Sequence, residues 1–472
     1  MTSTAQTQDP TPILAALAAA TLTASLGTSV ASVMLPTLTQ TFSATVSDVQ
    51  WVVLAYLMSL TITIVSAGRM GDLYGHRGVL ISGLIVFVIG SVLCATAQNL
   101  DLLIAGRAVQ GLGGAILIAL PMSMARDLVP TERLGTAMGI LGTTSAVGTA
   151  LGPSLGGLLL AWGDWRIAFW FLAAFATIAV ILSVAFVPRN ATRIVASPKE
   201  LDLLGTLLLA IALAAYALAT SGGAVGIPVP TAALFVFALI AFVIFMIFET
   251  HVASPLVPIV LLRERNTCIG FIMNLCVGTV MMSTLVVGPF FLAFSLGLNE
   301  VFIGLVLAVG PAVSALSGIP AGLLTDRWGA NRVVLVGLMQ AMLGLLCLAI
   351  LPRYFGVGGY VVALIVLTPA FQLFLAANNT IVLIDADKDQ RGRLSGLLGL
   401  SRNLGLMTGA AATPTLFVMF LGSGNAAQAQ VKDVTHAFSM TFMAASGLMM
   451  VALGLMIFSR TARPKETSVF TD

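Results

Sequence analysis

Long apolar segments separated by short polar interruptions run along almost the whole chain. A transmembrane helix needs roughly 20 mostly apolar residues. The segments are continuously apolar rather than alternating, which excludes the strands of a membrane barrel. The pattern therefore predicts an all-α membrane protein with fourteen transmembrane helices. The predicted helices span residues 13–35, 51–68, 79–97, 102–124, 134–161, 166–187, 203–221, 230–248, 267–296, 300–322, 333–351, 358–384, 394–421 and 437–458.

Composition agrees with this pattern and excludes several other classes of protein. The chain is 58% hydrophobic and only 9% charged, whereas a soluble protein is about 25% charged. Residues 1–12 contain no lysine or arginine, so we expect the first apolar segment to be a retained helix rather than a signal peptide. The 4 cysteines form no CxxC pair, so we expect no metal and no other cofactor. No basic tract with interleaved aromatic residues predicts nucleic-acid binding.

Lysines and arginines concentrate in cytoplasmic loops of membrane proteins, so their distribution predicts orientation. With the N-terminus placed in the cytoplasm, only Arg166, Arg353 and Lys432 fall on the outer side, and Arg107 and Arg402 fall within predicted helices. The other lysines and arginines fall on the cytoplasmic side. We therefore expect a multi-pass protein of the cell (inner) membrane with both termini in the cytoplasm.

A short charged motif follows the second predicted helix and recurs, with the same spacing of Gly, Asp and Gly, after the tenth. The first copy contains Gly68, Asp72, Gly75 and Arg77, and the second contains Gly322, Asp326, Arg327, Gly329 and Arg332. Glycine permits a tight turn, and the charged groups could latch one face and release it when two halves rock. The alternative is a plain turn with cytoplasmic positive charges, but two matched copies favour gating loops.

The repeat also predicts domains, because parallel repeats occur in transporters whose halves rock about a central site. Gly148 and Gly152 in the fifth predicted helix have the same spacing as Gly405 and Gly409 in the thirteenth. Since the second helix matches the tenth, helices seven and eight are the insertion. We predict a six-helix bundle in residues 1–200, the inserted pair in 201–252, and a second six-helix bundle in 253–472.

Polar residues inside apolar helices are the candidates for a substrate path. A charged side chain within a membrane is costly and marks a functional site by default. Arg107 lies close to a helix end, so reaching out to the interface is its alternative role. Amides in membrane helices more often join helices than bind ligands. The candidates are Arg107, Gln110, Asn274, Gln372, Asn378, Asn379 and Arg402.

The fifth predicted helix carries a glycine-rich pattern around a proline. Glycines repeated at this spacing line one helix face and permit close packing, and a proline favours a bend. The alternative is a generic packing seam. The residues are Gly148, Gly152, Pro153, Gly156 and Gly157.

These motifs together resemble those of the major facilitator superfamily. Residues 68–77 are similar to its loop signature between helices 2 and 3, residues 107–114 to its helix 4 signature, and residues 148–157 to the antiporter signature of its drug exporters. Tyr56, Trp165 and the start of the seventh helix at Asp202 also resemble the fourteen-helix drug:proton antiporter branch. The resemblance implies export of small molecules from the cytoplasm by alternating access, driven by the proton gradient, with Tyr56 on the substrate path. We expect the protein to be a monomer.

One departure from this branch concerns coupling. The branch usually has an aspartate in helix 1, where this chain has Gly27, and none of the 19 acidic residues falls in the middle of a predicted helix. Three hypotheses therefore stay open: proton-driven export of drug-like molecules, transport of an anionic or neutral solute with Arg107 or Arg402 as counter-charge, and a non-transporting membrane sensor. We expect no enzyme, because the helices contain no nucleophile with a base and no metal-ligand set.

Overall fold

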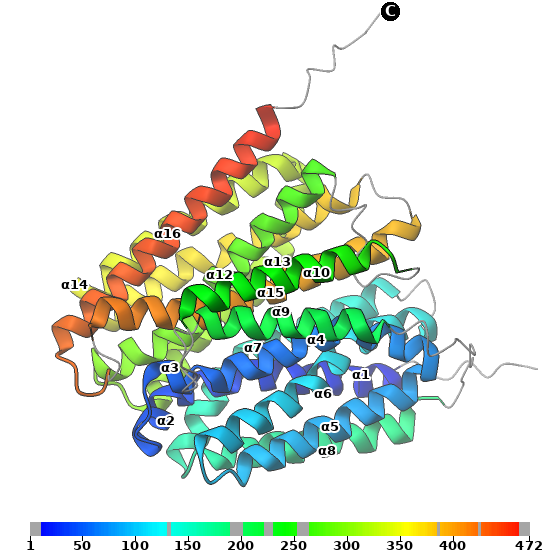
Figure 1. Cartoon of the computed structure of the whole chain (residues 1–472), viewed down its shortest axis with the longest axis horizontal. Helices are drawn as coiled ribbons and strands as arrows, with labels where there is room; N and C mark the ends of the chain where they lie inside the picture. The colour runs from blue at the N-terminus through cyan, green and yellow to red at the C-terminus, as the bar shows by residue number, and fades with distance from the viewer. Residues whose placement is uncertain are drawn as a thin grey trace, which may run out of the picture.

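The computed structural model describes residues 11–129, 134–188, 202–220, 230–252, 264–384, 388–422 and 426–461, and every regular element in them is a helix (Figure 1). The elements are α1 (Thr11–Ser29), the 3-10 helix η1 (Val30–Met34), α2 (Leu35–Thr41), α3 (Val46–Val49), α4 (Trp51–Tyr74), α5 (His76–Ala95), α6 (Leu100–Leu128), α7 (Leu134–Ala161), α8 (Arg166–Phe186), α9 (Leu203–Thr220), α10 (Thr231–Glu249), α12 (Arg265–Phe294), α13 (Glu300–Trp328), α14 (Ala330–Ile384), α15 (Lys388–Leu421) and α16 (Val431–Thr461).

Helix length and hydropathy confirm an all-α membrane protein. Within the described ranges, 12 helical segments are long and apolar enough to cross a membrane. One of them is the 54-residue segment Ala330–Leu383, and it contains Gly356 with φ 54°, where two helices meet at a kink. Leu204–Thr220 is a further apolar helix that is shorter than these segments. The number fourteen stays a prediction.

The repeated charged motif differs from its sequence prediction in one respect. A loop was expected from Gly68 and from Gly322, but α4 continues to Tyr74 and α13 to Trp328. Only the second glycine of each motif turns the chain: Gly75 has φ 91° and Gly329 has φ 81°, a backbone region that favours glycine. The two copies therefore share one geometry, a helix that ends at a left-handed glycine.

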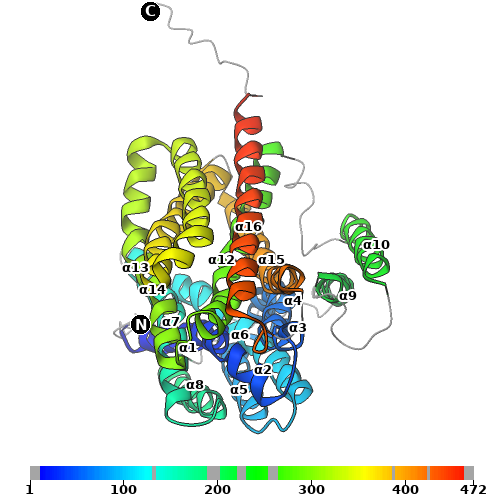
Figure 2. The same cartoon turned by 90° about the vertical axis from the view of Figure 1, so that its left-hand side faces the viewer.

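Close helix–helix contacts at a pair of glycines occur twice in the molecule. α7 packs against α1, where Gly148 and Gly152 meet Ser25 and Ser29. α15 packs against α12 in the same way, and the helices approach so closely at two glycines of α15 that a Cβ atom would overlap a backbone carbonyl of α12. These two glycines are Gly405 and Gly409, which meet the carbonyls of Leu275 and Thr279. Helices α1–α8 lie together on one side of the molecule and α12–α16 on the other, and α7 contacts α13 between them (Figures 1 and 2). We refer to these two groups as the first and the second body.

The pair α9 and α10 lies at one side of these bodies, with α9 inside and α10 outside (Figure 2). Near its start, α9 reaches α4 through the hydroxyls of Thr206 and Ser66, 3.0 Å apart. Near its end, the Tyr216 hydroxyl donates a hydrogen bond of 3.0 Å to Thr408 Oγ1 in α15. α9 therefore contacts both bodies.

Candidate functional site

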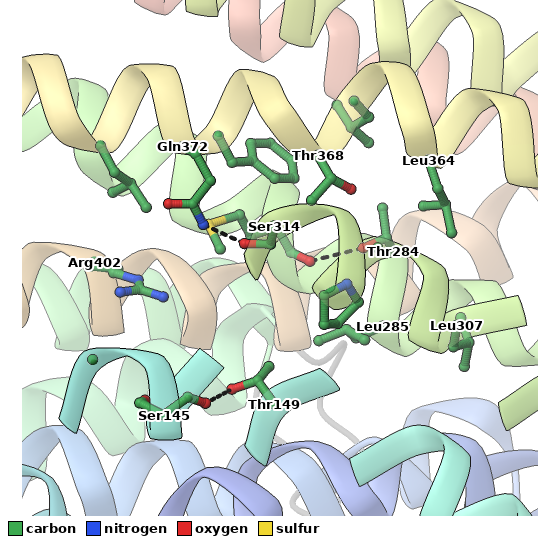
Figure 3. A pocket seen from close by; sticks show the side chains of 17 residues that line it. Ser145, Thr149, Thr284, Leu285, Leu307, Ser314, Leu364, Thr368, Gln372 and Arg402 are labelled. Atoms are coloured by element: carbon green, nitrogen blue, oxygen red, sulfur yellow. Dashed lines mark hydrogen bonds between the residues drawn. The ribbon is translucent and has the colours of Figure 1, made fainter. Parts of the chain in front are cut away.

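A cavity of about 280 Å³ lies between α7 of the first body and α12–α15 of the second (Figure 3). Residues from five helices converge on it. Its lining consists of Gly142, Ser145 and Thr149 from α7, Met281, Thr284 and Leu285 from α12, Leu307, Gly310, Pro311 and Ser314 from α13, Leu364, Leu367, Thr368, Phe371, Gln372 and Leu375 from α14, and Arg402 from α15.

The cavity wall combines apolar side chains with hydroxyls, one amide and one guanidinium. The Gln372 amide donates a hydrogen bond to Ser314 Oγ (Figure 3). Thr149 and Thr284 donate to backbone carbonyls of their own helices, both at 3.0 Å. These hydroxyl oxygens keep acceptor capacity, and the residues that line the cavity include no carboxylate.

Arg402 is the charged side chain of this lining. It is exposed, and Figure 3 shows its guanidinium between α15 and α7, on the polar side of the cavity. Within the part of the chain that the structure describes, Arg402 makes no hydrogen bond through its side chain and no ion pair. Arg402, a candidate from the sequence, thus lies in the cavity wall, and no described residue pairs with its charge.

Arg107 has the opposite surroundings. It is fully buried among the helices of the first body, so its side chain does not reach out to an interface. Its Nε donates to the Val52 carbonyl at 2.8 Å, one of its terminal nitrogens donates to Gln110 Oε1, and its guanidinium lies 4.3 Å from the centre of the Tyr56 ring. Gln110 in turn donates to Ser91 Oγ at 2.7 Å. Arg107, Gln110 and Tyr56 therefore form one buried network, and none of them lines the cavity described above.

The position of the missing helix 1 acid lies beside this network. A Cβ atom on Gly27 would come within 2.7 Å of Phe87 Cζ and 3.4 Å of the Tyr56 hydroxyl. The Tyr56 hydroxyl itself donates to the Ala24 carbonyl at 3.0 Å. Phe87 therefore fills the space that an aspartate side chain would need. The sequence alone did not single out Phe87, because one phenylalanine in an apolar helix carries no signal.

Most of the candidate amides join helices. Asn274 in α12 donates to the Leu398 carbonyl at 2.8 Å and to Ser401 Oγ at 2.9 Å, which links α12 to α15. Asn378 donates to the Gly270 carbonyl at 3.2 Å. Asn379 is exposed and does not line this cavity. Gln372 lines the cavity, whereas these three asparagines do not.

The glycine-rich pattern of α7 serves two contacts. Gly157 meets the backbone carbonyl of Glu300 so closely that a Cβ atom would overlap it, and Gly304 meets the carbonyl of Pro153 in the same way. The hydroxyl of Ser154 adds a hydrogen bond of 3.4 Å to the Gly304 carbonyl. The first body is therefore in backbone contact with the second at this end of α7. The remaining residues of the pattern, Gly148, Gly152 and Gly156, face α1 and η1.

Among the gating side chains that the structure describes, none is joined to another by an ion pair. Arg77 donates to the Val184 carbonyl in α8 at 2.7 Å. Asp326, Arg327 and Arg332 are exposed and, among the described residues, make no ion pair. The side chain of Asp72 lies outside the described part of the structure.

Comparison with known proteins identifies the family. The profile of the Major Facilitator Superfamily matches residues 17–263 and 270–472. The chain is 31% identical over 396 residues to the uncharacterized transporter YebQ of Escherichia coli, covering 84% of this chain and 86% of that protein. It is 26% identical over 441 residues to the riboflavin transporter RibZ of Clostridioides difficile, covering 93% and 95%. It is also 26% identical to the multidrug resistance protein Stp of Mycobacterium tuberculosis, covering 84% and 73%.

A solved structure shows the same fold. The bacterial homologue of the human lysosomal transporter Spinster, in an inward-facing and occupied conformation, superposes with a TM-score of 0.72 at 15% identity. The match covers 97% of this chain and 98% of that one. The profile, the relatives and the fold agree, and the chain belongs to the Major Facilitator Superfamily, whose matched members here are membrane transporters rather than enzymes.

Proposed function

We propose that this protein is a secondary active exporter of small amphipathic organic molecules, which works by alternating access and exchanges its substrate for protons. The observation that carries the proposal is the cavity, because it is lined by α7 from one body and by α12–α15 from the other. A site at the interface of two bodies changes its access when they rock. The relatives named for riboflavin transport and multidrug resistance support an organic substrate. The resemblance of α7 to the antiporter signature supports proton exchange.

The topology is part of the same proposal. If α14 is counted as two helices at Gly356 and α9 as a short span, the chain has the fourteen spans of the drug:proton antiporter branch. Residues 1–200 and 253–472 then form the two bundles, with 201–252 inserted between them. Both termini lie in the cytoplasm and the protein lies in the inner membrane, which agrees with the bacterial origin of its relatives.

In this topology, the contact of Gly157 with Glu300 lies at the outer end of α7 and α13. The two bodies are therefore in backbone contact on the outer side of the cavity. We expect this contact to open when the outer side of the cavity becomes accessible during transport.

Accessibility of the cavity from both faces tests alternating access without knowledge of the substrate. We would replace the 4 native cysteines, introduce Ser314→Cys in the cavity, and measure its reaction with a charged thiol reagent in right-side-out and in inside-out vesicles. Transport predicts reaction from both faces. Ser91→Cys, in the buried Arg107 network, is the control and should react from neither. In a sensor that does not alternate, the cysteine of Ser314→Cys would react from one face only, and that result would contradict the proposal.

Proton exchange has its own test. Inside-out vesicles that contain the protein should accumulate an exported aromatic dye when they are acidified inside, and nigericin, which collapses the pH gradient, should abolish the accumulation. If the accumulation were the same with and without nigericin, the proposal of proton exchange would be wrong. That result would not contradict alternating access.

A further inference from the structure

We propose that the transported molecule carries an anionic group, such as a carboxylate, sulfonate or phosphate, and that Arg402 is the residue that binds it. The inference rests on the proposed function, since it specifies the substrate class of the same cavity. The cavity offers a guanidinium, hydroxyls and an amide on one side and aliphatic and aromatic side chains on the other. An aromatic or alicyclic molecule with one anionic substituent matches both sides.

Arg402 carries a charge that no described residue pairs with. An arginine inside a membrane protein is retained when it pairs with something, because removing its hydration is costly. Among the described residues Arg402 has no carboxylate partner and no hydrogen-bond acceptor for its side chain, and it faces open space. A planar guanidinium binds carboxylate, sulfonate and phosphate oxygens with paired hydrogen bonds. The missing partner is therefore best supplied by the substrate.

The surroundings of the Arg402 charge favour an anion over a cation. The residues that line the cavity include no aspartate or glutamate, so an organic cation would meet the Arg402 charge without compensation. The Gln372 amide is fixed by Ser314 on the same side of the cavity. Figure 3 shows Gln372, Ser314 and Arg402 from three different helices around one space. Their donor groups can share the oxygens of an anionic group that Arg402 holds.

The driving force for export and the residue at position 27 also favour an anionic substrate. Export of a monoanion moves one negative charge outward, and an inside-negative membrane potential favours that movement. An exporter of cations works against this potential and needs a carboxylate to bind substrate and proton in turn. An exporter of anions does not need such a carboxylate. At Gly27, Phe87 fills the space that a carboxylate side chain would need. If a proton is exchanged as well, it moves a second charge in the favourable direction.

Binding of a matched pair of probes tests the proposal. Naphthalene-2-sulfonate is a permanent monoanion, and naphthalene-2-sulfonamide has nearly the same shape without the charge. We would measure both by isothermal titration calorimetry on the full chain in a non-ionic detergent. The variants are Arg402→Gln, Arg402→Lys and, as a control, Arg353→Gln, which removes an exposed arginine beside Gly356. Gel filtration and thermal unfolding would verify that each variant is folded.

The expected result is that wild type binds the sulfonate at least about tenfold more tightly than the sulfonamide, since charged hydrogen bonds carry this preference. Arg402→Gln should remove the preference for the sulfonate and leave the affinity for the sulfonamide within about twofold of wild type. Arg402→Lys should restore part of it, and Arg353→Gln should change neither affinity.

Three results would overturn the proposal. They are equal affinity of wild type for both probes, equal weakening of both probes by Arg402→Gln, and binding of neither probe by folded wild type. A preference for naphthyl-trimethylammonium, the matching cation, would overturn it as well. None of these results changes the two-sided reaction of Ser314→Cys, so failure of this inference is distinguishable from failure of the transport function.

Discussion

Arg107 in α6 and Arg402 in α15 are both arginines inside apolar helices, but only one of them has partners. Arg107 is enclosed by Val52, Gln110 and Tyr56, whereas Arg402 faces a cavity with its charge unpaired among the described residues. The difference shows that an arginine within the helices of a membrane protein has two distinct uses. One that hydrogen-bonds to neighbouring helices holds them together, and one that the fold leaves without a partner can bind a ligand.

Removing each charge in turn gives the largest expected contrast. Arg107→Gln leaves the Val52 carbonyl and Gln110 without their buried donor, which we expect to cost about 3 kcal/mol of stability. Arg402→Gln removes an unpaired charge and should change stability by less than about 0.5 kcal/mol. Thermal unfolding of both variants in the same detergent measures the difference. If the two variants lost the same stability, the division of roles between the arginines would be wrong.

Restoring the helix 1 acid beside Arg107 tests how that region is filled. Gly27→Asp places a Cβ atom 2.7 Å from Phe87 Cζ, and such overpacking costs about 1–3 kcal/mol. The double variant Gly27→Asp with Phe87→Ala should regain part of this loss, because the ring no longer occupies the space. Unfolding midpoints of the single and double variants measure the effect. A single variant as stable as wild type would show that Phe87 does not block the site.

The seam of α7 and α13 should control access to the Arg402 cavity. A Cβ atom at Gly157 would overlap the Glu300 carbonyl, so Gly157→Ala should disfavour the closed seam by about 1–3 kcal/mol. The reaction of Ser314→Cys from the outer face should then accelerate. Gly318→Ala, in α13, is the matched control, because no atom lies within 4 Å of the position of its Cβ. Equal acceleration by both substitutions would show that the seam is not the barrier.

The smallest effect is expected at Tyr56. Tyr56→Phe loses the hydrogen bond of 3.0 Å to the Ala24 carbonyl but keeps a ring under Arg107, so we expect a loss of about 1 kcal/mol. Tyr56→Leu removes the ring as well and should cost more. Unfolding midpoints measure both. If Tyr56→Leu were no worse than Tyr56→Phe, the ring would contribute nothing to holding Arg107.

Hydropathy predicted the helices because the lipid bilayer imposes a strong and local requirement on each segment. It missed the true ends of α4 and α13, since Gly68 and Gly322 are followed by further helical turns that leave the apolar pattern. The internal repeat was readable in Gly75 and Gly329 because a left-handed turn restricts the residue type at that point.

The candidate site was predicted only in part. Arg402 and Gln372 stood out as polar residues in apolar helices. Ser314 and Thr368 did not, because serine and threonine occur throughout such helices and bond to their own backbone. Sequence alone also could not separate Arg402 from Arg107, since the partners of Arg107 come from helices far apart in the chain, such as Val52 in α4.

The most direct test of the account is the flux of an anion under an imposed membrane potential. Proteoliposomes loaded with naphthalene-2-sulfonate at equal pH on both sides would receive an inside-negative potential from valinomycin and a potassium gradient, with protein-free liposomes as the blank. The account predicts that the potential accelerates loss of the sulfonate, that it leaves the rate of naphthalene-2-sulfonamide unchanged, and that Arg402→Gln abolishes the acceleration. Sulfonate loss that is indifferent both to the potential and to Arg402→Gln would contradict it.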